Sequence, residues 1–260
     1  MNAEKSKSKV DKGGKIGKLK IFLVVIIAIL GVVEVYIVAV QEDENNTTYS
    51  LEKNIGDFRL VSDSVLLENG KIVVLFVGAE ACPYCAAESW GLVNALQQYG
   101  SLTGLAEIYS NSSESFSNIP GYGFANASLQ STKVAFWEVE TTTSSWNQKL
   151  QSLNSTENSL FQKFDSGGSI PFVLIGGVYL HIGSSYSPAI LANLNWTEVL
   201  KQASSSSEIG IDVSNEASNI TTVIKYVDDH MESFEVVNNV VMTGQNQELP
   251  MQMPEQIERI

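Results

Sequence analysis

The sequence predicts a mixed α/β domain, with a central mixed sheet flanked by helices, preceded by one transmembrane helix. The first observation is a short, β-branched apolar run at 72–77, which leads through a Cys-Pro-Tyr-Cys motif into a helical apolar pattern. The second is an apolar strand at 172–175 that begins after a proline and continues through a Gly-Gly turn into a return strand. The third is an apolar segment at 21–40, long enough to cross a bilayer.

The first forty residues indicate a membrane anchor. Residues 1–20 carry seven lysines, two acids and no apolar period, which is typical of a disordered cytoplasmic tail. Residues 21–40 span roughly 30 Å as a helix, and their one charge, Glu34, either reaches toward the outer surface or meets a partner helix. Lysines before this span and acids after it predict a single-pass signal anchor with an extracytoplasmic main domain. A cleaved signal peptide is the alternative, although its apolar region is usually only about 7–15 residues long.

Signals beyond the span indicate an exported, acidic glycoprotein. Residues 41–260 hold nine basic residues against 26 acidic ones, so we expect no nucleic-acid partner, because such a partner requires a basic surface. Seven N-x-S/T acceptors follow the span, where chance would give roughly three, and this excess predicts an N-glycosylated domain of archaeal or eukaryotic origin. The acceptors are Asn45, Asn46, Asn111, Asn126, Asn154, Asn195 and Asn219.

The main domain is expected at 58–207, after a linker at 41–57. Its first segment, 58–67, fits either a short helix or a strand, and a second strand is expected at 104–109. An insertion is expected at about 110–165. Within it we expect a loop at 110–132, a strand at 134–140 and a helix over 145–164 with a break near Asn154.

A proline also marks the second half of the domain. Because Pro171 opens a core strand, its missing N–H must lie where it does no harm, and we expect a cis bond after Ile170. The return strand at 178–182 contains His181. The remaining expectations are a helix at 187–204, a serine-rich linker at 204–207, a C-terminal helix at 208–232 whose amphipathic pattern covers about 216–231, and a frayed tail at 233–260.

The Cys-Pro-Tyr-Cys motif lies between the strand and the helix. Cys82 is expected at or beside the helix N-cap, with Pro83 at the first helical position, where a missing N–H costs nothing. The partial positive charge of a helix N-terminus favours a thiolate, so Cys82 is the candidate nucleophile and Cys85 the candidate resolving thiol. A structural disulfide would close too short a loop to stabilise the fold much. A zinc site would need two further ligands, for which the only histidines are His181 and His230. We therefore expect no metal and no cofactor.

The order of these elements from about 58 to 204 resembles the thioredoxin fold, with an insertion like that of Dsb-type disulfide oxidoreductases. More closely, GAEACPYCAAESW, GGSIPF and IGSSYSP resemble the membrane-anchored family known as domain of unknown function 929. The resemblance implies a thioredoxin-like fold in which Cys82 attacks, Cys85 resolves and Pro171 is the cis-proline beside them. It also implies that Ile170 pairs with a substrate peptide, and we expect Pro83 and Tyr84 to contact that peptide.

One departure from thioredoxin concerns proton transfer. A buried acid six residues before the first cysteine assists proton transfer in thioredoxin, whereas this chain has Phe76 at that position. Glu80 and Glu88 are the nearby carboxyl groups that could substitute for it.

These signals favour an enzyme, a thiol–disulfide oxidoreductase outside the cytoplasmic membrane. Its expected partners are the thiols or disulfides of exported proteins and a redox partner that resets the cysteines. Two alternatives remain open. One is a thioredoxin-fold copper chaperone that holds Cu(I) with Cys82, Cys85 and His181, and the other is a non-catalytic binding module.

Overall fold

The computed structural model describes residues 51–238. The predicted cytoplasmic tail, the transmembrane span, Asn45, Asn46 and most of the C-terminal tail lie outside the described residues. Within residues 51–238, no helix combines the length and the apolar character that crossing a bilayer requires.

The strands are β1 (Asn54–Ile55), β2 (Phe58–Leu60), β3 (Ser64–Glu68), β4 (Lys71–Gly78), β5 (Gly100–Thr103), β6 (Ala106–Tyr109), β7 (Pro120–Gly123), β8 (Ser128–Ser131), β9 (Val134–Glu140), β10 (Phe172–Ile175), β11 (Tyr179–Ile182) and β12 (Glu235–Asn238). The helices are α2 (Pro83–Leu96), α3 (Ser155–Phe164), α4 (Trp196–Ala203), α5 (Glu208–Asp229) and the 3₁₀ turns η1 (Pro188–Leu191) and η2 (Met231–Ser233).

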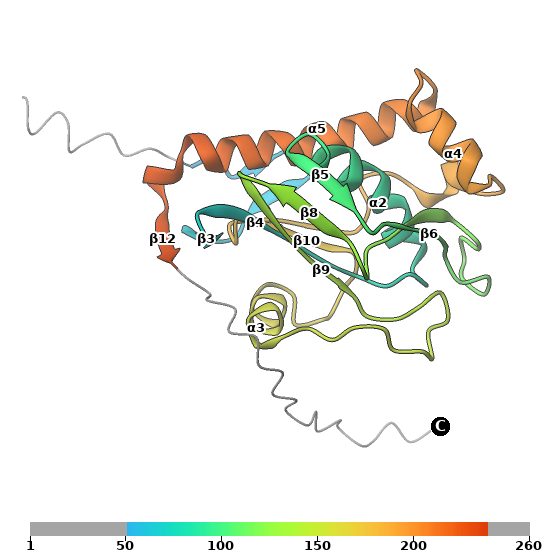
Figure 1. Ribbon diagram of the computed structural model, residues 1–260, viewed down its shortest axis with the longest axis horizontal. Helices are drawn as coiled ribbons and strands as arrows, with labels where there is room; N and C mark the ends of the chain where they lie inside the picture. The colour runs from blue at the N-terminus through green and yellow to red at the C-terminus, as the bar shows by residue number, and fades with distance from the viewer. Residues whose placement is uncertain (1–50, 239–260) are drawn as a thin grey trace, which may run out of the picture. The chain divides into compact units, whose positions relative to one another are not determined.

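β4 lies at the centre of an eight-stranded mixed sheet (Figure 1). β10 pairs antiparallel with one edge of β4 and places Phe172 opposite Val77. β9 runs parallel along the other edge and places Glu140 opposite Gly78. β11, β2 and β1 continue the sheet beyond β10, while β3 and β12 extend it beside the start of β4. Because β4 and β9 are parallel, their carboxyl ends lie at the same edge of the sheet.

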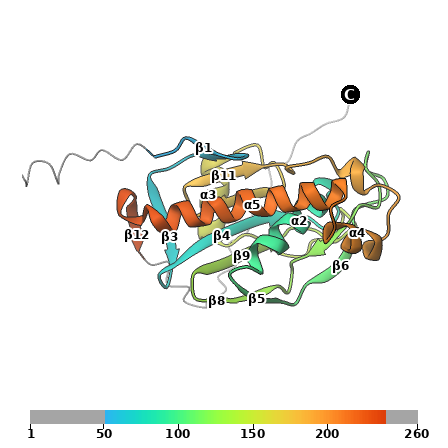
Figure 2. The same cartoon turned by 90° about the horizontal axis from the view of Figure 1, so that it is seen from above.

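Helices cover both faces of this sheet, which confirms the predicted mixed α/β architecture. α2 and α5 lie on one face and α3 on the other (Figures 1 and 2). β4 is buried on both faces because its side chains alternate between two cores. Ile72, Val74 and Phe76 belong to the core beneath α2 and α5, and the intervening residues belong to the core beneath α3.

The segment predicted as a loop at 110–132 contains two short strands, β7 and β8, within otherwise irregular chain. β6 pairs with β7, and β5 with β8, in two small antiparallel sheets outside the central one. The β6–β7 hairpin packs directly on α2: Trp90 Nε1 donates a hydrogen bond to the carbonyl of Pro120. A Cβ added to Gly121 would come within 2.6–2.7 Å of the Ala86 backbone. Four-residue strands of mixed composition are too short to show a period of two in the sequence. The sequence therefore did not predict β7 and β8.

Two predicted helices are shorter than expected. Only 155–164 of the segment 145–164 is helical, because Asn154 caps it: its Oδ1 accepts the N–H groups of Thr156 and Glu157. The predicted helix at 187–204 is wrong in its middle, where the chain leaves η1, passes through a left-handed Asn193 and starts again as α4. Side chains that cap a helix thus decide where it starts.

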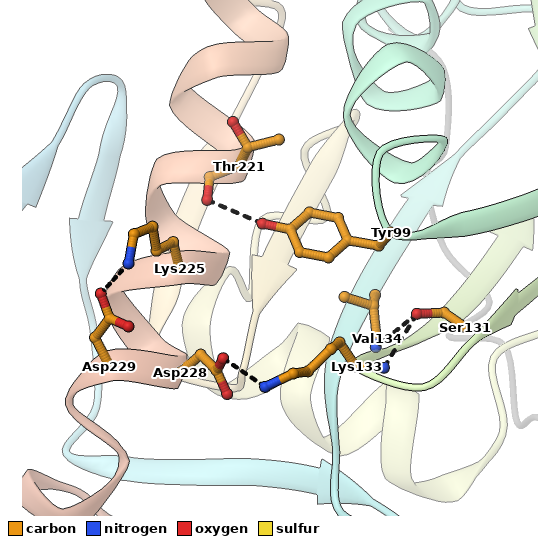
Figure 3. Close-up of polar contacts among 8 residues, drawn as sticks. All are labelled: Tyr99, Ser131, Lys133, Val134, Thr221, Lys225, Asp228 and Asp229. Atoms are coloured by element: carbon orange, nitrogen blue, oxygen red, sulfur yellow. Dashed lines mark hydrogen bonds and ion pairs between the residues drawn. The ribbon is translucent and has the colours of Figure 1, made fainter.

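The C-terminal helix lies within the predicted range 208–232 and begins before the amphipathic pattern at about 216–231. α5 begins at Glu208, where the Oγ of Ser207 caps it by accepting the N–H of Gly210. Figure 3 shows how its C-terminal half is held: the Tyr99 hydroxyl donates to the carbonyl of Thr221 over 3.2 Å, and Lys133 Nζ forms an ion pair with Asp228 over 2.8 Å. Four residues of the predicted frayed tail form β12, which pairs parallel with β3.

Candidate dithiol site

The two cysteines lie where β4 ends and α2 begins. Cys82 is the N-cap of α2 and Pro83 opens the helix, as predicted. The backbone N–H of Cys85 donates a hydrogen bond to Cys82 Sγ over 3.2 Å. Both thiols are free, and both side chains are buried, with 5% of Cys82 and 3% of Cys85 exposed. One of the orphan N–H groups of the helix N-terminus is thus satisfied by sulfur.

The surroundings of the two thiols shift their pKa values in opposite directions. The pKa of Cys82 is lowered, first by a hydrogen bond from the Cys85 thiol and further by backbone N–H groups of Cys85 and Tyr84. The pKa of Cys85 is raised, first by burial and then by the same hydrogen bond, in which it is the donor. The arrangement favours a Cys82 thiolate beside a protonated Cys85.

Pro171 lies at the same edge of the sheet. The Ile170–Pro171 peptide bond is cis, as the sequence indicated. Because Phe172 is opposite Val77, the register places Pro171 next to Gly78, the last residue of β4 before the dithiol loop. Ile170 is half-buried and packs against the core that contains both cysteines.

A buried carboxyl group that the sequence analysis did not identify faces this site. Glu140 ends β9 opposite Gly78 and is 1% exposed. Its Oε1 accepts the N–H of Phe124 over 3.2 Å, and its Oε2 has no hydrogen-bond partner among the described residues. Burial raises the pKa of Glu140 to about 8, and the charge of Cys82 adds to this effect. The charge of Glu140 in turn contributes to the raised pKa of Cys85.

Gly78, which ends β4, lies against both the Phe76 ring and the Cys85 thiol. A Cβ added to Gly78 would lie 3.4 Å from Cys85 Sγ and 2.5 Å from the Phe76 ring. Phe76 therefore lies against Gly78 on β4, and the buried acid comes from the neighbouring strand β9. The signal in the sequence was the polar end of an otherwise apolar strand at 134–140, but only the β4–β9 register shows what it faces.

The two carboxyl groups proposed for proton transfer occupy different places. Glu80 is half-buried; its pKa is raised by burial, and its charge acts on Glu140. Glu88 is fully buried, where its Oε2 accepts the N–H of Ser185 over 3.1 Å and its carboxyl group meets that of Glu216. Glu88 is thus directed toward α5, and Glu80 stays near the dithiol loop.

The surface beside the cysteines is formed by two loops of the insertion. The N–H of Asn111 donates to the carbonyl of Ala81 over 2.9 Å, so the first loop lies against the residue before Cys82. The Nε1 of Trp146, from the second loop, donates to Oε1 of Glu114 in the first over 2.6 Å. An open hollow of about 610 Å³ adjoins these loops and is lined by Glu80, Ala106, Glu107, Ile108, Tyr109, Ser110, Asn111, Ser112, Asn118 and Ser144.

Tyr84, between the two cysteines, points outward from this site. Its side chain is 43% exposed, and its ring meets the edge of Phe116, with the centroids 5.9 Å apart. Pro83 is buried at the first turn of α2. Tyr84 therefore presents an aromatic surface next to the nucleophilic sulfur, whereas Pro83 does not.

The histidines lie apart from the cysteines. Nδ1 of His181 is 3.3 Å from the carbonyl oxygen of Asp57, and the ring packs 5.5 Å from Phe58. His230 caps the end of α5 and stacks on Tyr226. In the part of the chain that the structure describes, no three His, Cys, Asp or Glu side chains converge as metal ligands.

The five described glycosylation acceptors differ in accessibility. Asn126 and Asn195 are exposed, whereas Asn111, Asn154 and Asn219 are half-buried. Asn111 Nδ2 donates to the carbonyl of Ser144 over 2.8 Å, and the Asn219 side chain packs against Gly56. The sequence motif alone does not distinguish these environments.

Comparisons with known proteins gave one match, to a family model over part of the chain. The chain matched no curated protein and no solved structure. Residues 57–154 match the family model described as a domain of unknown function (DUF929). That segment contains β4, both cysteines, β9 and Glu140, and it ends before Pro171. The chain is thus similar to this family over the segment that carries the dithiol and its buried acid.

Proposed function

We propose that this protein is a membrane-anchored, extracytoplasmic thiol–disulfide oxidoreductase with a thioredoxin-like domain. The observation that carries the proposal is the pairing of a low-pKa Cys82 at the N-cap of α2 with a buried, high-pKa Cys85. A nucleophilic thiolate and a protonated neighbour are the two groups that disulfide exchange requires.

The topology supports the thioredoxin-like part of the proposal. The central strand order is β9, β4, β10, β11, with β9 parallel to β4 and the other two antiparallel in turn. The dithiol follows β4 at the start of a helix, and the cis bond of Pro171 directly precedes β10. This is the arrangement that the thioredoxin resemblance implies, with β5 to β8 as additions.

Two exchange steps reduce a substrate disulfide. The Cys82 thiolate attacks one substrate sulfur, which forms a mixed disulfide and releases the other substrate sulfur as a thiolate that takes up a proton. Cys85 then loses its proton and attacks Cys82 Sγ, which forms the Cys82–Cys85 disulfide and releases the second substrate thiolate. The substrate gains two electrons and the protein loses two. The same steps in reverse introduce a disulfide into a substrate dithiol.

Glu140 is suited to exchange the proton of Cys85. The resolving thiol is buried, so its proton needs an acceptor within the protein. Glu140 has one oxygen without a donor and, with a pKa of about 8, it can both take and return a proton near neutral pH. Glu140 thus takes the role for which the sequence suggested Glu80 or Glu88.

The substrate is proposed to be an extended segment of an exported protein. Ile170 is half-buried directly before Pro171, and the ring of Tyr84, between the two cysteines in sequence, packs edge to face with Phe116. An aromatic pair beside a reactive sulfur suits the apolar side chains that flank a substrate cysteine. The membrane anchor at 21–40 and the glycans complete the proposal, and both await direct tests.

The test is disulfide exchange by the full-length protein, purified in detergent. We expect it to accelerate insulin reduction by dithiothreitol, or oxidation of a dithiol peptide, and Cys82→Ser to return either rate to the uncatalysed level. Cys85→Ser should accumulate a mixed disulfide between Cys82 and the substrate, visible on a non-reducing gel. A folded wild-type protein with neither activity would refute the proposal.

A further inference from the structure

Away from the dithiol, two buried glutamates meet between the helices α2 and α5. Glu88 of α2 is 0% exposed and Glu216 of α5 is 1% exposed. The two carboxyl groups are adjacent, and each acts on the pKa of the other. Since two carboxylates accept but do not donate, a hydrogen bond between them requires a proton.

The packing of the helices is shaped around this contact. A Cβ added to Gly91, one turn along α2 from Glu88, would lie 2.2 Å from the carboxyl carbon of Glu216. The side chain of Glu216 therefore rests against the bare Cα of Gly91. A larger residue at position 91 would displace the carboxyl group, so the glycine provides the space in which the two acids meet.

The protein supplies few donors to these four carboxyl oxygens. One oxygen of Glu88 accepts the N–H of Ser185 over 3.1 Å. The other oxygen of Glu88 and both oxygens of Glu216 have no N–H or O–H donor among the described residues. The nearby Tyr186 hydroxyl donates elsewhere, to the carbonyl of Ala87 over 2.6 Å. A shared proton is the donor that these groups lack.

The surrounding charges do not replace that proton. His181 of β11 carries a basic group whose charge acts on Glu88, but among the described residues neither of its nitrogens donates to either carboxyl group. Asp57, in the turn before β2, adds negative charge near both glutamates. Asp212 of α5 adds negative charge near Tyr186, which itself faces the pair. No lysine or arginine lies among the groups that act on the pair within residues 51–238.

We propose that Glu88 and Glu216 share a proton as an acid-dependent clamp between α2 and α5, so that the domain is most stable in an acidic medium. The clamp holds the helix that carries Cys82 and Cys85, but the proposal rests on the buried contact and is independent of any redox activity. It also assigns an environment to the main domain, namely a compartment or exterior on the acidic side of neutral.

The sign of the effect follows from where the proton is bound. Burial raises the pKa of Glu216 well above its usual range, and burial also raises the pKa of Glu88. Below about pH 4.5 both the folded and the unfolded chains hold these protons. As the pH rises above that value, the unfolded chain releases them while the folded chain keeps the shared one, so the stability contributed by the clamp declines.

Thermal unfolding of the full-length protein in detergent, followed by circular dichroism between pH 5 and 8, tests the clamp. The melting temperature of the wild type should fall by about 5 °C or more over this range. Glu216→Gln, whose amide donates a permanent hydrogen bond, should melt above the wild type at pH 8 and show a smaller fall. Glu232→Gln, which changes an exposed acid in η2, is the matched control and should follow the wild type.

Parallel curves for the wild type and Glu216→Gln would overturn the proposal, as would a variant less stable than the wild type at pH 8. Glu88→Gln provides a second, independent variant for the same comparison. If neither amide variant folds, the infrared carboxylic-acid band shows whether the pair holds a proton. The band is measured in a Glu140→Gln background, because the raised pKa of Glu140 would otherwise contribute to it. The band should persist at pH 6.5, and its absence would show that the pair holds no proton.

Discussion

The backbone N–H of Cys85 lies 3.2 Å from Sγ of Cys82 and donates a hydrogen bond to it. This one contact joins the helix N-terminus to the nucleophile. Together with the S–H of Cys85, which also donates to Cys82, it makes the charge on the first sulfur depend on the protonation of the second. The two thiols therefore titrate as a pair, and a change at one alters the other.

The first prediction concerns that dependence. Cys85→Ala keeps the backbone N–H but removes the thiol donor, so the pKa of Cys82 should rise relative to the wild type. The measurement is the rate of alkylation of Cys82 by iodoacetamide as a function of pH. In the wild type the midpoint should lie below the value of about 8.5 for a free cysteine.

Tyr84→Ala is the control, since it keeps both thiols and the helix start. Its alkylation midpoint should remain close to that of the wild type. An unchanged or lower midpoint in Cys85→Ala would show that the Cys85 thiol does not stabilise the Cys82 thiolate.

The second prediction concerns Glu140. If Glu140 accepts the proton of Cys85, the release of substrate from the mixed disulfide should accelerate as the pH rises through about 8, where Glu140 ionises. Glu140→Gln should slow this step by at least about tenfold and remove the inflection. Stopped-flow measurement of the resolving step across pH 6–9.5 provides the profile.

Glu138→Gln is the matched control, because Glu138 lies two residues earlier on β9 and its carboxyl group contacts Gln151 instead. This variant should keep the inflection, at a slightly lower pH than in the wild type, because the charge of Glu138 contributes to the raised pKa of Glu140. If the profile of Glu140→Gln superimposes on that of the wild type, another group takes the proton.

Glu140 also carries a stability cost with a definite sign. Its pKa is about 8 in the folded chain and 4.5 when unperturbed. Between these values the unfolded chain releases the proton that the folded chain keeps, so stability falls as the pH rises and the cost is complete only above pH 8. Glu140→Gln should therefore raise the free energy of unfolding at pH 9, by at most about 5 kcal/mol, with little change at pH 4.

The third prediction concerns the glycosylation acceptors. Asn126 and Asn195 are exposed, and the Oδ1 of Asn195 makes its helix-capping bond without using Nδ2, the atom that bears a glycan. Asn111 uses its Nδ2 to hold Ser144 beside the dithiol loop, and Asn219 is packed against Gly56. Mass spectrometry of peptides from the protein in its native host should find glycans at the first two residues and none at the last two.

Asn126→Gln should lose one glycan and therefore migrate faster on a denaturing gel. Asn219→Gln should migrate like the wild type. A glycan on Asn111 would contradict the prediction, since its attachment would break the bond to Ser144 and cover the approach to Cys82.

The sequence by itself determined where the dithiol and the cis-proline lie relative to the strands and helices. The β-branched run of β4, the N-capping Cys82, Pro83 at the first turn and the cis Pro171 are all set by neighbours close in the chain. Helix starts, buried strands and proline positions depend on local periodicity and on missing N–H groups, which a sequence shows directly.

Only the tertiary structure decided which acids serve the site and which support the fold. Glu140 and Glu216 each look like an ordinary charged residue in sequence, yet both are buried. Glu140 reaches the cysteines because β9 pairs in parallel with β4, and Glu216 reaches Glu88 because α5 lies against Gly91 of α2. The register of strands and the packing of helices depend on contacts between segments far apart in the chain. The local sequence pattern does not predict such contacts.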